Sequence, residues 1–170
     1  RIMGYSVYDT DSEAKRLMES SLEVVQKLSE CFGRDIYHNG RLNRGLLSSR
    51  VFGKSDKIVL LNSIVHPVVR FDFYRWSESL NEEICFVESA ILYESRFDEL
   101  VDEVWTVTAP EELRIGRVRQ RSGLTEEEIK KRMAAQLSEE EKQRRAAHII
   151  WNDGNVSVIH RVLSLLKSLE

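Results

Sequence analysis

Four short apolar runs alternate along this chain with long stretches of helical periodicity. Each run is closed by polar or turn residues, and the runs cover residues 5–8, 84–87, 104–108 and 149–151. Runs of this kind are typical of strands that are buried on both faces, as in a parallel sheet. Because helical stretches separate them, the order predicts an α/β fold with a parallel sheet.

The stretch between the first two runs is expected to form a helical insert. Apolar residues recur there at helical spacing before Gly33 ends the helix, namely Leu17, Leu22, Val25, Leu28 and Phe32. Residues 38–41 predict a turn. Pro67 suits the first turn of a further helix that carries Val69, Phe73 and Trp76. Residues 12–81 are therefore expected to be mostly helical.

Residues 111–145 form a second unusual segment, rich in both basic and acidic side chains. Thr125 precedes Glu128 by three positions, and Ser138 precedes Glu141 by three, so two capping boxes are expected to open two helices of a hairpin. The apolar stripe of this segment is thin. A charged hairpin with little core is expected to be mobile and able to close over phosphates.

The composition excludes several classes of protein. With 170 residues, 42% hydrophobic and 31% charged, the chain can bury an ordinary core. Its net charge of -3 does not suggest a nucleic-acid-binding protein, and no apolar run approaches the length of a membrane helix. Cys31 and Cys85 form neither a zinc pattern nor a disulfide framework, and we expect both to be buried. This usage suits a reducing cytosol, and no signal peptide is apparent.

Residues 53–55 imitate the end of a phosphate-binding loop of the form G-x-x-x-x-G-K-[ST]. The first glycine of that motif would stand at position 48, which is Ser48. No strand is expected before the segment, so its amides would not form a phosphate nest. We interpret it as a surface turn.

Asp9 and Asp11 follow the first predicted strand, at the edge where open α/β sheets bind ligands. Two carboxylates at this spacing can hold Mg²⁺ through water or accept a proton from a hydroxyl nucleophile. The alternative is that Asp11 caps the following helix. Glu88 ends the second strand and suits a metal-side role, or else is a loop carboxylate bonded to backbone amides.

Arginines at helical spacing begin the charged segment. Arg114, Arg117 and Arg121 share one face of an expected helix, and guanidinium groups match phosphate oxygens well. The alternative is a solvated charged face.

Two weaker candidates lie elsewhere in the chain. His66 and Arg70 stand four apart in the insert, where they suit a ligand, although His66 could instead cap a helix opened by Pro67. Asn152 and Gly154 follow the last apolar run. The tight loop expected there could lie against a flat nucleotide base, or it could be an ordinary turn.

Six segments in order then resemble one family. They are the D-T-D segment at 9–11, R-L-N-R at 41–44 with R-V-F at 50–52, H-P-V-V-R at 66–70, Q-R-S-G-L-T at 120–125, R-M-A-A-Q at 132–136 and I-W-N-D-G at 150–154. Together they resemble the dephospho-coenzyme A kinase family over nearly all of the chain. Thr10 replaces an alanine of the family pattern, and Ala90 replaces a proline.

The resemblance implies an α/β fold with a parallel-sheet, P-loop NTPase-like core, a helical substrate-binding insert and a helical lid. Residues 1–20, 82–117 and 146–170 would form the nucleotide-binding core, 21–81 the coenzyme A-binding domain, and 118–145 the lid. The family begins with a strand and a P-loop, whereas this sequence begins with Arg1, after that point. We therefore expect an upstream piece to be missing.

The implied activity is ATP-dependent phosphorylation of the ribose 3′-hydroxyl of dephospho-coenzyme A, giving coenzyme A and ADP. Alternatives are another P-loop kinase for nucleotides or nucleosides, or a non-catalytic α/β binding domain if the P-loop is truly absent. The expected cofactors are ATP and Mg²⁺. We expect a cytoplasmic monomer or weak homo-oligomer whose partners are dephospho-coenzyme A and ATP, with no nucleic acid and no membrane.

The resemblance also implies roles for individual residues. Asp11 would be the catalytic base and Arg117 would neutralise the transferring phosphoryl group. Arg121, Asn152 and Gly154 would bind ATP, the last two beside its adenine. Asp9, His66 and Arg70 would bind the acceptor, and Asp9 could also hold Mg²⁺ through water, with no direct metal ligand.

Overall fold

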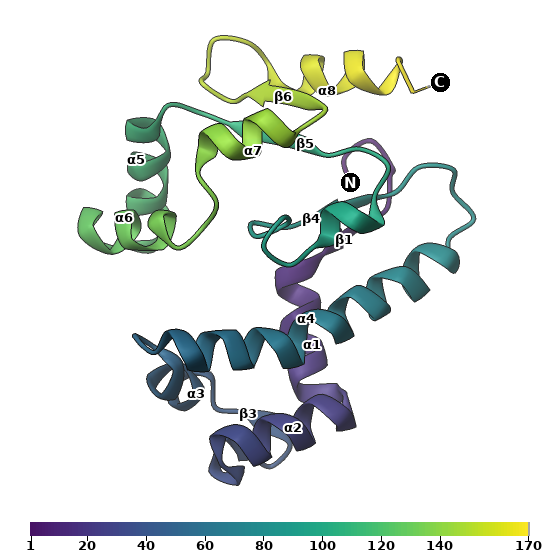
Figure 1. Cartoon of the computed structure of the whole chain (residues 1–170). Coiled ribbons are helices and arrows are strands. Elements are labelled where there is room, and N and C mark those ends of the chain that lie inside the picture. The colour runs from purple at the N-terminus through teal and green to yellow at the C-terminus, as the bar shows by residue number, and fades with distance from the viewer. Residues whose placement is uncertain (170) are drawn as a thin grey trace. The chain divides into compact units, whose positions relative to one another are not determined.

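Two pairs of parallel strands form in the computed structural model, which describes residues 1–169 (Figure 1). Strand β1 (Val7–Asp9) pairs with β4 (Phe86–Glu88), and β5 (Trp105–Thr108) pairs with β6 (His148–Trp151). These strands lie within two residues of the four apolar runs. The predicted α/β class with parallel strands is confirmed.

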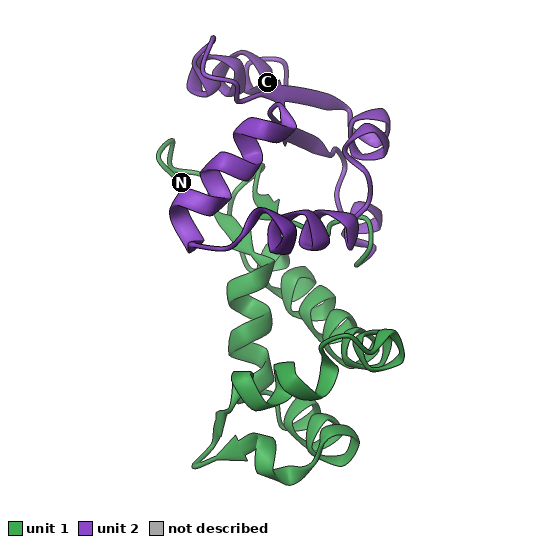
Figure 2. Cartoon of the chain, turned by 90° about the vertical axis from the view of Figure 1, so that its left-hand side faces the viewer, with its two compact units in different colours: residues 1–95 green, residues 96–170 purple. Residues whose placement is uncertain are grey.

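The chain divides into two compact units, residues 1–95 and 96–170 (Figure 2). The first unit holds β1, β4 and the helical insert. The second holds β5, β6 and the charged segment. This division reflects packing, so the three functional domains expected from the sequence stay a prediction.

The first unit opens with two helices where the sequence suggested one. Helix α1 (Thr10–Ser20) ends at Ser21, whose side chain then caps α2 (Leu22–Phe32) by accepting from the Val24 amide. The break changes which apolar residues face inward. Val24 is completely buried, whereas Leu22 is 87% exposed and does not belong to the core. The expected stripe is therefore wrong at Leu22, whereas Leu17, Leu28 and Phe32 of that stripe are buried.

A small hairpin follows the short 3₁₀ helix η1 (Arg34–Ile36). Strands β2 (Tyr37–His38) and β3 (Arg41–Leu42) pair antiparallel around the expected turn. Asn39 and Gly40 both adopt positive φ, at 49° and 74°. Asn-Gly suits a two-residue turn of this kind, and the sequence analysis found the turn but not its strands.

Helices α3 (Arg44–Val51) and α4 (Ser55–Glu78) complete the insert, and α1, α2 and α3 all pack against α4. The imitation P-loop is the turn between these two helices, as interpreted. Pro67 lies inside α4 and does not open it, so the expected helix start was wrong. Proline lacks the amide for one helical hydrogen bond, but apolar packing of Val65, Val69 and Phe73 holds the helix together.

The second unit contains η2 (Phe97–Leu100), α5 (Glu111–Ser122), α6 (Glu126–Ala134), α7 (Glu139–Arg145) and α8 (Val158–Leu166). Thr125 and Glu128 form the full capping box that was predicted at the start of α6. At α7 only half of the box forms. Ser138 accepts from the Glu141 amide, while the Glu141 carboxylate pairs with Arg144 and Arg145.

Two expectations about burial fail in the described residues. Strands β5 and β6 are not fully buried on either face, because Val107 is 57% exposed and Ile149 is 41% exposed, although Thr108 and Ile150 are buried. Cys31 is exposed and Cys85 is half-buried, so neither is a core residue. Within residues 1–169, no helix combines the length and apolar character needed to cross a bilayer.

Candidate active site

The first part of the candidate site is the junction between β1 and α1. Asp9 ends the strand and its carboxylate caps the helix. One oxygen accepts from the amides of Asp11 at 3.0 Å and Ser12 at 3.2 Å, and the other accepts from the Ser12 hydroxyl at 2.8 Å. The hydrogen bonds from Ser12 lower the pKa of Asp9, because they stabilise its charged form. Asp9 is therefore held ionised in one orientation.

The neighbouring Asp11 lies in the first turn of α1 and is exposed. The alternative in which Asp11 caps the helix is wrong, since Asp9 does so. Among the described residues, no hydrogen bond or ion pair engages the Asp11 carboxylate. Asp11 is thus the carboxylate at this junction whose oxygens can accept a proton.

The D-T-D segment is fixed to the adjacent strand. Asp9 lies in register with Glu88, so the two residues end neighbouring parallel strands. The buried Thr10 donates its hydroxyl to the Glu88 carbonyl at 3.0 Å. This bond explains a threonine between two aspartates, a role that the sequence analysis did not foresee. The Glu88 side chain itself is exposed.

His66 and Arg70 lie one turn apart on α4, within the same unit as Asp9. Burial lowers the pKa of His66, and the positive charge of Arg70 lowers it further. His66 therefore stays neutral near pH 7 and can donate and accept hydrogen bonds. Because α4 continues through this region, the alternative role of His66 as a helix cap is wrong.

In the second unit, Arg117 and Asn152 are brought together. Arg117 is exposed on α5 and donates from Nη1 to the Asn152 carbonyl at 2.8 Å, just after β6 ends. Gly154 has φ +90°, a conformation that favours glycine, so the loop turns sharply there. Arg121 lies one turn further along α5, with its side chain exposed. The hydrogen bond thus brings α5 and the loop after β6 together at Arg117 and Asn152, while Arg121 and Gly154 lie further along the same two segments.

Arg114 is the residue whose role the sequence did not reveal. It shares a helix with Arg117, but it donates to the Ala109 carbonyl at 3.0 Å and to Glu139 at 2.8 Å. Arg114 therefore ties α5 to the start of α7 and is occupied by protein groups. Its partner lies 25 positions away, and no local pattern could have identified it.

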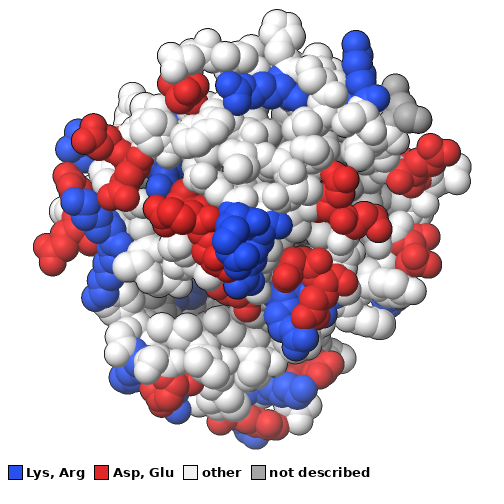
Figure 3. All heavy atoms as spheres, turned by 45° about the horizontal axis from the view of Figure 1, so that its top comes forward, with Lys and Arg blue, Asp and Glu red and all other residues white. Residues whose placement is uncertain are grey.

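Charges are otherwise mixed. On the face drawn in Figure 3, basic and acidic side chains lie next to each other without a broad field of one sign. Within the described residues, no group of three or more His, Cys, Asp or Glu side chains could hold a metal ion. Asp9 and Asp11 supply carboxylate oxygens, which are the ligand type that Mg²⁺ prefers.

A family model described as dephospho-CoA kinase matches residues 1–157. A dephospho-CoA kinase of Porphyromonas gingivalis is 35% identical over 168 residues, which cover 98% of this chain and 83% of the relative. One from Salinibacter ruber is 38% identical over 162 residues, covering 93% of this chain and 81% of the relative.

Solved structures show the same fold. The crystal structure of TT1252 from Thermus thermophilus has a TM-score of 0.84 and 33% identity, covering 99% of this chain and 86% of that one. A dephospho-CoA kinase from Campylobacter jejuni has a TM-score of 0.70 at 23% identity, covering 99% of this chain and 89% of that one, which supports the fold alone.

Proposed function

This chain belongs to the dephospho-CoA kinase family, and from that premise we propose how its residues divide the work of the reaction. The activity is ATP-dependent phosphorylation of the ribose 3′-hydroxyl of dephospho-coenzyme A, giving coenzyme A and ADP. The observation that carries the assignment is the match over residues 1–157, which includes both carboxylates of the D-T-D segment and the arginines of α5.

Asp11 is the proposed general base. Its carboxylate is exposed and unengaged by the described residues, whereas Asp9 already accepts three hydrogen bonds. The low pKa of Asp9 also makes it the poorer proton acceptor. Asp11 would orient the 3′-hydroxyl and take its proton as the oxygen attacks the γ-phosphorus, while Asp9 holds the first turn of α1 in place and contacts the acceptor.

Acceptor binding falls to the α4 face in this proposal. Neutral His66 can donate to or accept from a polar group of dephospho-coenzyme A, and the Arg70 guanidinium suits one of its phosphate oxygens. The two side chains lie one helical turn apart, so one ligand group can reach both.

Arg117 and Arg121 are proposed to act on the phosphates of ATP. In phosphoryl transfer, catalysis is mainly positioning and charge stabilisation, and arginine supplies both. The hydrogen bond from Arg117 to the Asn152 carbonyl fixes one end of its guanidinium and leaves Nη2 for a phosphoryl oxygen. Asn152 and Gly154 would border the adenine.

Magnesium is proposed to accompany ATP. When bound, Mg²⁺ neutralises charge on the phosphate oxygens, and Asp9 would contact it through water. We also propose that the protein works in the cytoplasm as a monomer or weak homo-oligomer and does not bind nucleic acid.

The test is an assay of the full-length protein with ATP and dephospho-coenzyme A, in which ADP release and coenzyme A are both measured. Nucleosides and nucleotides are offered separately as acceptors. We expect phosphorylation of dephospho-coenzyme A and a loss of about 10²–10⁴-fold in turnover for Asp11→Asn, with ATP binding retained.

Asp56→Asn is the matched control, because Asp56 is an exposed carboxylate in the first turn of another helix, α4. It should keep the parent rate. Turnover of Asp11→Asn within about threefold of the parent would refute the base assignment. Preferred phosphorylation of a nucleoside would refute the substrate.

A further inference from the structure

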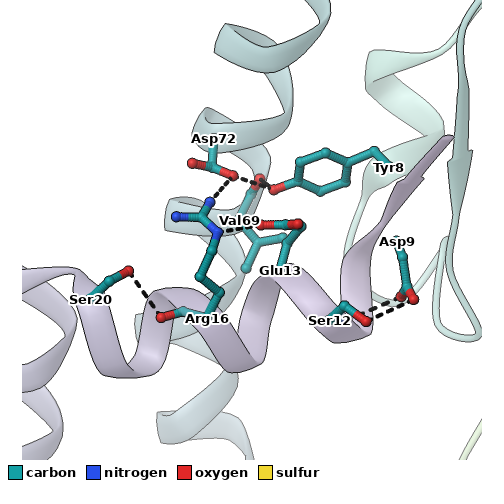
Figure 4. Close-up of polar contacts among 8 residues, drawn as sticks. All are labelled: Tyr8, Asp9, Ser12, Glu13, Arg16, Ser20, Val69 and Asp72. Carbon is teal, nitrogen blue, oxygen red and sulfur yellow. Dashed lines mark hydrogen bonds and ion pairs between the residues drawn. The ribbon is translucent and has the colours of Figure 1, made fainter. Parts of the chain in front are cut away.

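A polar network begins at Tyr8, immediately before the D-T-D segment, and all of its members belong to the first unit (Figure 4). The Tyr8 hydroxyl donates to an Asp72 oxygen at 2.7 Å, and Arg16 Nη2 donates to the same oxygen at 2.7 Å. Arg16 Nε in turn donates to Glu13. The network therefore joins β1, α1 and α4 through one carboxylate oxygen.

The strand end of this network is rigid. Tyr8 is only 3% exposed, and its ring packs edge-on against Phe73 and lies against Trp76, with both ring centroids 5.3 Å from its own. Burial and the bond to Asp72 raise the pKa of Tyr8, so its hydroxyl stays protonated and remains the donor. The other end is partly solvated, since the Arg16 side chain is 50% exposed and that of Asp72 is 29% exposed.

The network lies between the two groups of residues that the reaction requires. Tyr8 immediately precedes Asp9, and Arg16 lies on the helix whose first turn carries Asp11. Asp72 follows Arg70 by two positions and His66 by six on α4. Fixing Arg16 to Asp72 therefore fixes the rotation of α1 about its axis relative to the α4 face that is proposed to hold the acceptor.

We infer that Asp72 and Arg16, with the Tyr8 hydroxyl, are positioning residues that set the Asp11 carboxylate against the acceptor hydroxyl. This inference rests on the proposed function. In this inference the network acts through the orientation of α1 and not through contact with a substrate. A displacement of about 1 Å between reacting groups can cost about 10²-fold in rate, so loose positioning lowers kcat.

The experiment compares full-length Asp72→Asn and Tyr8→Phe with Glu19→Gln. Asp72→Asn keeps the side-chain volume but removes the charge, and Tyr8→Phe removes only the hydroxyl. Glu19→Gln is the control, because Glu19 forms another ion pair of α1, with Arg44 at 3.3 Å, near the end of the helix away from Asp11. The side chains of that pair are similarly exposed, at 53% and 35%.

We expect kcat to fall about 10- to 100-fold in Asp72→Asn and less in Tyr8→Phe, with KM for ATP unchanged. Amide exchange in residues 9–14 should become faster in both variants. Asp72→Glu, which restores the charge, should recover part of kcat. Glu19→Gln should keep the parent kcat.

Parent kcat in Asp72→Asn and Tyr8→Phe would overturn the inference, as would an equal loss in Glu19→Gln. If Asp72→Asn does not fold, Tyr8→Phe decides alone, because it keeps the ring packing. The proposed function fails separately, if the parent protein does not phosphorylate dephospho-coenzyme A, and that result does not depend on Asp72.

Discussion

Asp9 shows how one side chain can serve both a strand end and a helix start. The sequence correctly placed two carboxylates at the carboxyl end of a strand, and the structure puts Asp9 in register with Glu88 there. The sequence analysis named Asp11 as the alternative helix cap, whereas the structure gives that role to Asp9, because an aspartate at either position suits a cap. The choice depends on the residue at which the strand ends, and such boundaries are set by tertiary pairing.

Removing the cap should cost stability, and removing only the charge should not. Asp9→Ala loses the three hydrogen bonds to the start of α1, so we expect the free energy of unfolding to fall by about 1 kcal/mol. Asp9→Asn keeps a good capping side chain and should stay near the parent. Urea unfolding followed by circular dichroism measures both. Equal stability of Asp9→Ala and the parent would contradict the capping role.

His66 should make stability depend on pH. Its pKa in the folded protein lies below the ordinary value of 6.5, so below that pH the unfolded chain binds more protons than the folded one. The free energy of unfolding therefore falls as pH drops through 6.5 toward the folded pKa. His66→Gln should reduce the loss of melting temperature between pH 7.5 and 5.5. An unchanged difference between these pH values would show that other groups cause it.

Arg117 should act mainly in the transition state. Its guanidinium is fixed at one end by the Asn152 carbonyl, so Arg117→Ala removes a pre-positioned charge. We expect kcat to fall about 10²–10³-fold with little change in KM for dephospho-coenzyme A. Arg119→Ala, an exposed arginine on the same helix, is the control and should keep the parent kcat. A rise in KM without loss of kcat would instead assign Arg117 to ground-state binding.

At the scale of elements, periodicity located the helices but not their interruptions. Ser21 ends one helix and begins the next, although the apolar spacing runs on through it. Conversely, Pro67 suggests a helix start, yet α4 continues through it because its buried face packs on both sides of the proline. The four apolar runs therefore predicted all four strands of the two parallel pairs, whereas tertiary packing determines where the helices are interrupted.

Gly33 offers a test at this scale, since it ends α2 with φ +93°. A Cβ there would lie 2.6 Å from Arg50 Nη1 and 2.7 Å from Asp35 Oδ1, displacing the Arg50 side chain that bonds the end of α2. We expect Gly33→Ala to lower the free energy of unfolding by about 1–2 kcal/mol from the backbone conformation alone.

Gly45→Ala is the matched control, because Gly45 lies inside α3 with only ordinary contact at 3.6 Å. It should stabilise the protein by about 0.5–1 kcal/mol. The two substitutions thus have opposite signs in the same denaturation assay. Destabilisation of equal size at both positions would show that added bulk, and not positive φ, is responsible.

At the scale of the whole molecule, the order of the motifs indicated the function more specifically than any single motif did. Each segment alone had an ordinary structural explanation, and the helix cap that was expected at Asp11 is formed by Asp9 instead. What the sequence could not supply were bonds between distant residues, such as Tyr8 with Asp72 or Arg114 with Glu139. These bonds join elements whose partners no local pattern identifies.

The last prediction concerns closure of the charged segment around the triphosphate. The sequence predicts that residues 118–145 form a loosely held lid, but α7 is bonded to β5. Thr106 donates to the Lys142 carbonyl at 3.4 Å, and Gln143 donates to Thr108 at 3.3 Å. The Arg114–Glu139 ion pair, whose side chains are 28% and 18% exposed, adds a third attachment. We therefore expect α7 to stay in place and residues 123–138 to move.

Amide hydrogen exchange of the full-length protein, with and without a non-hydrolysable ATP analogue, tests this division. Residues 123–138 should gain protection with the analogue, because closure over the triphosphate orders this segment. Closure would also exclude the water that competes with the ribose hydroxyl for the phosphoryl group. Residues 139–145 should be protected in both states. Glu139→Gln should weaken that protection by removing the charge that holds Arg114. Equally slow exchange of residues 123–138 in both states would mean that this segment is a fixed hairpin and does not close.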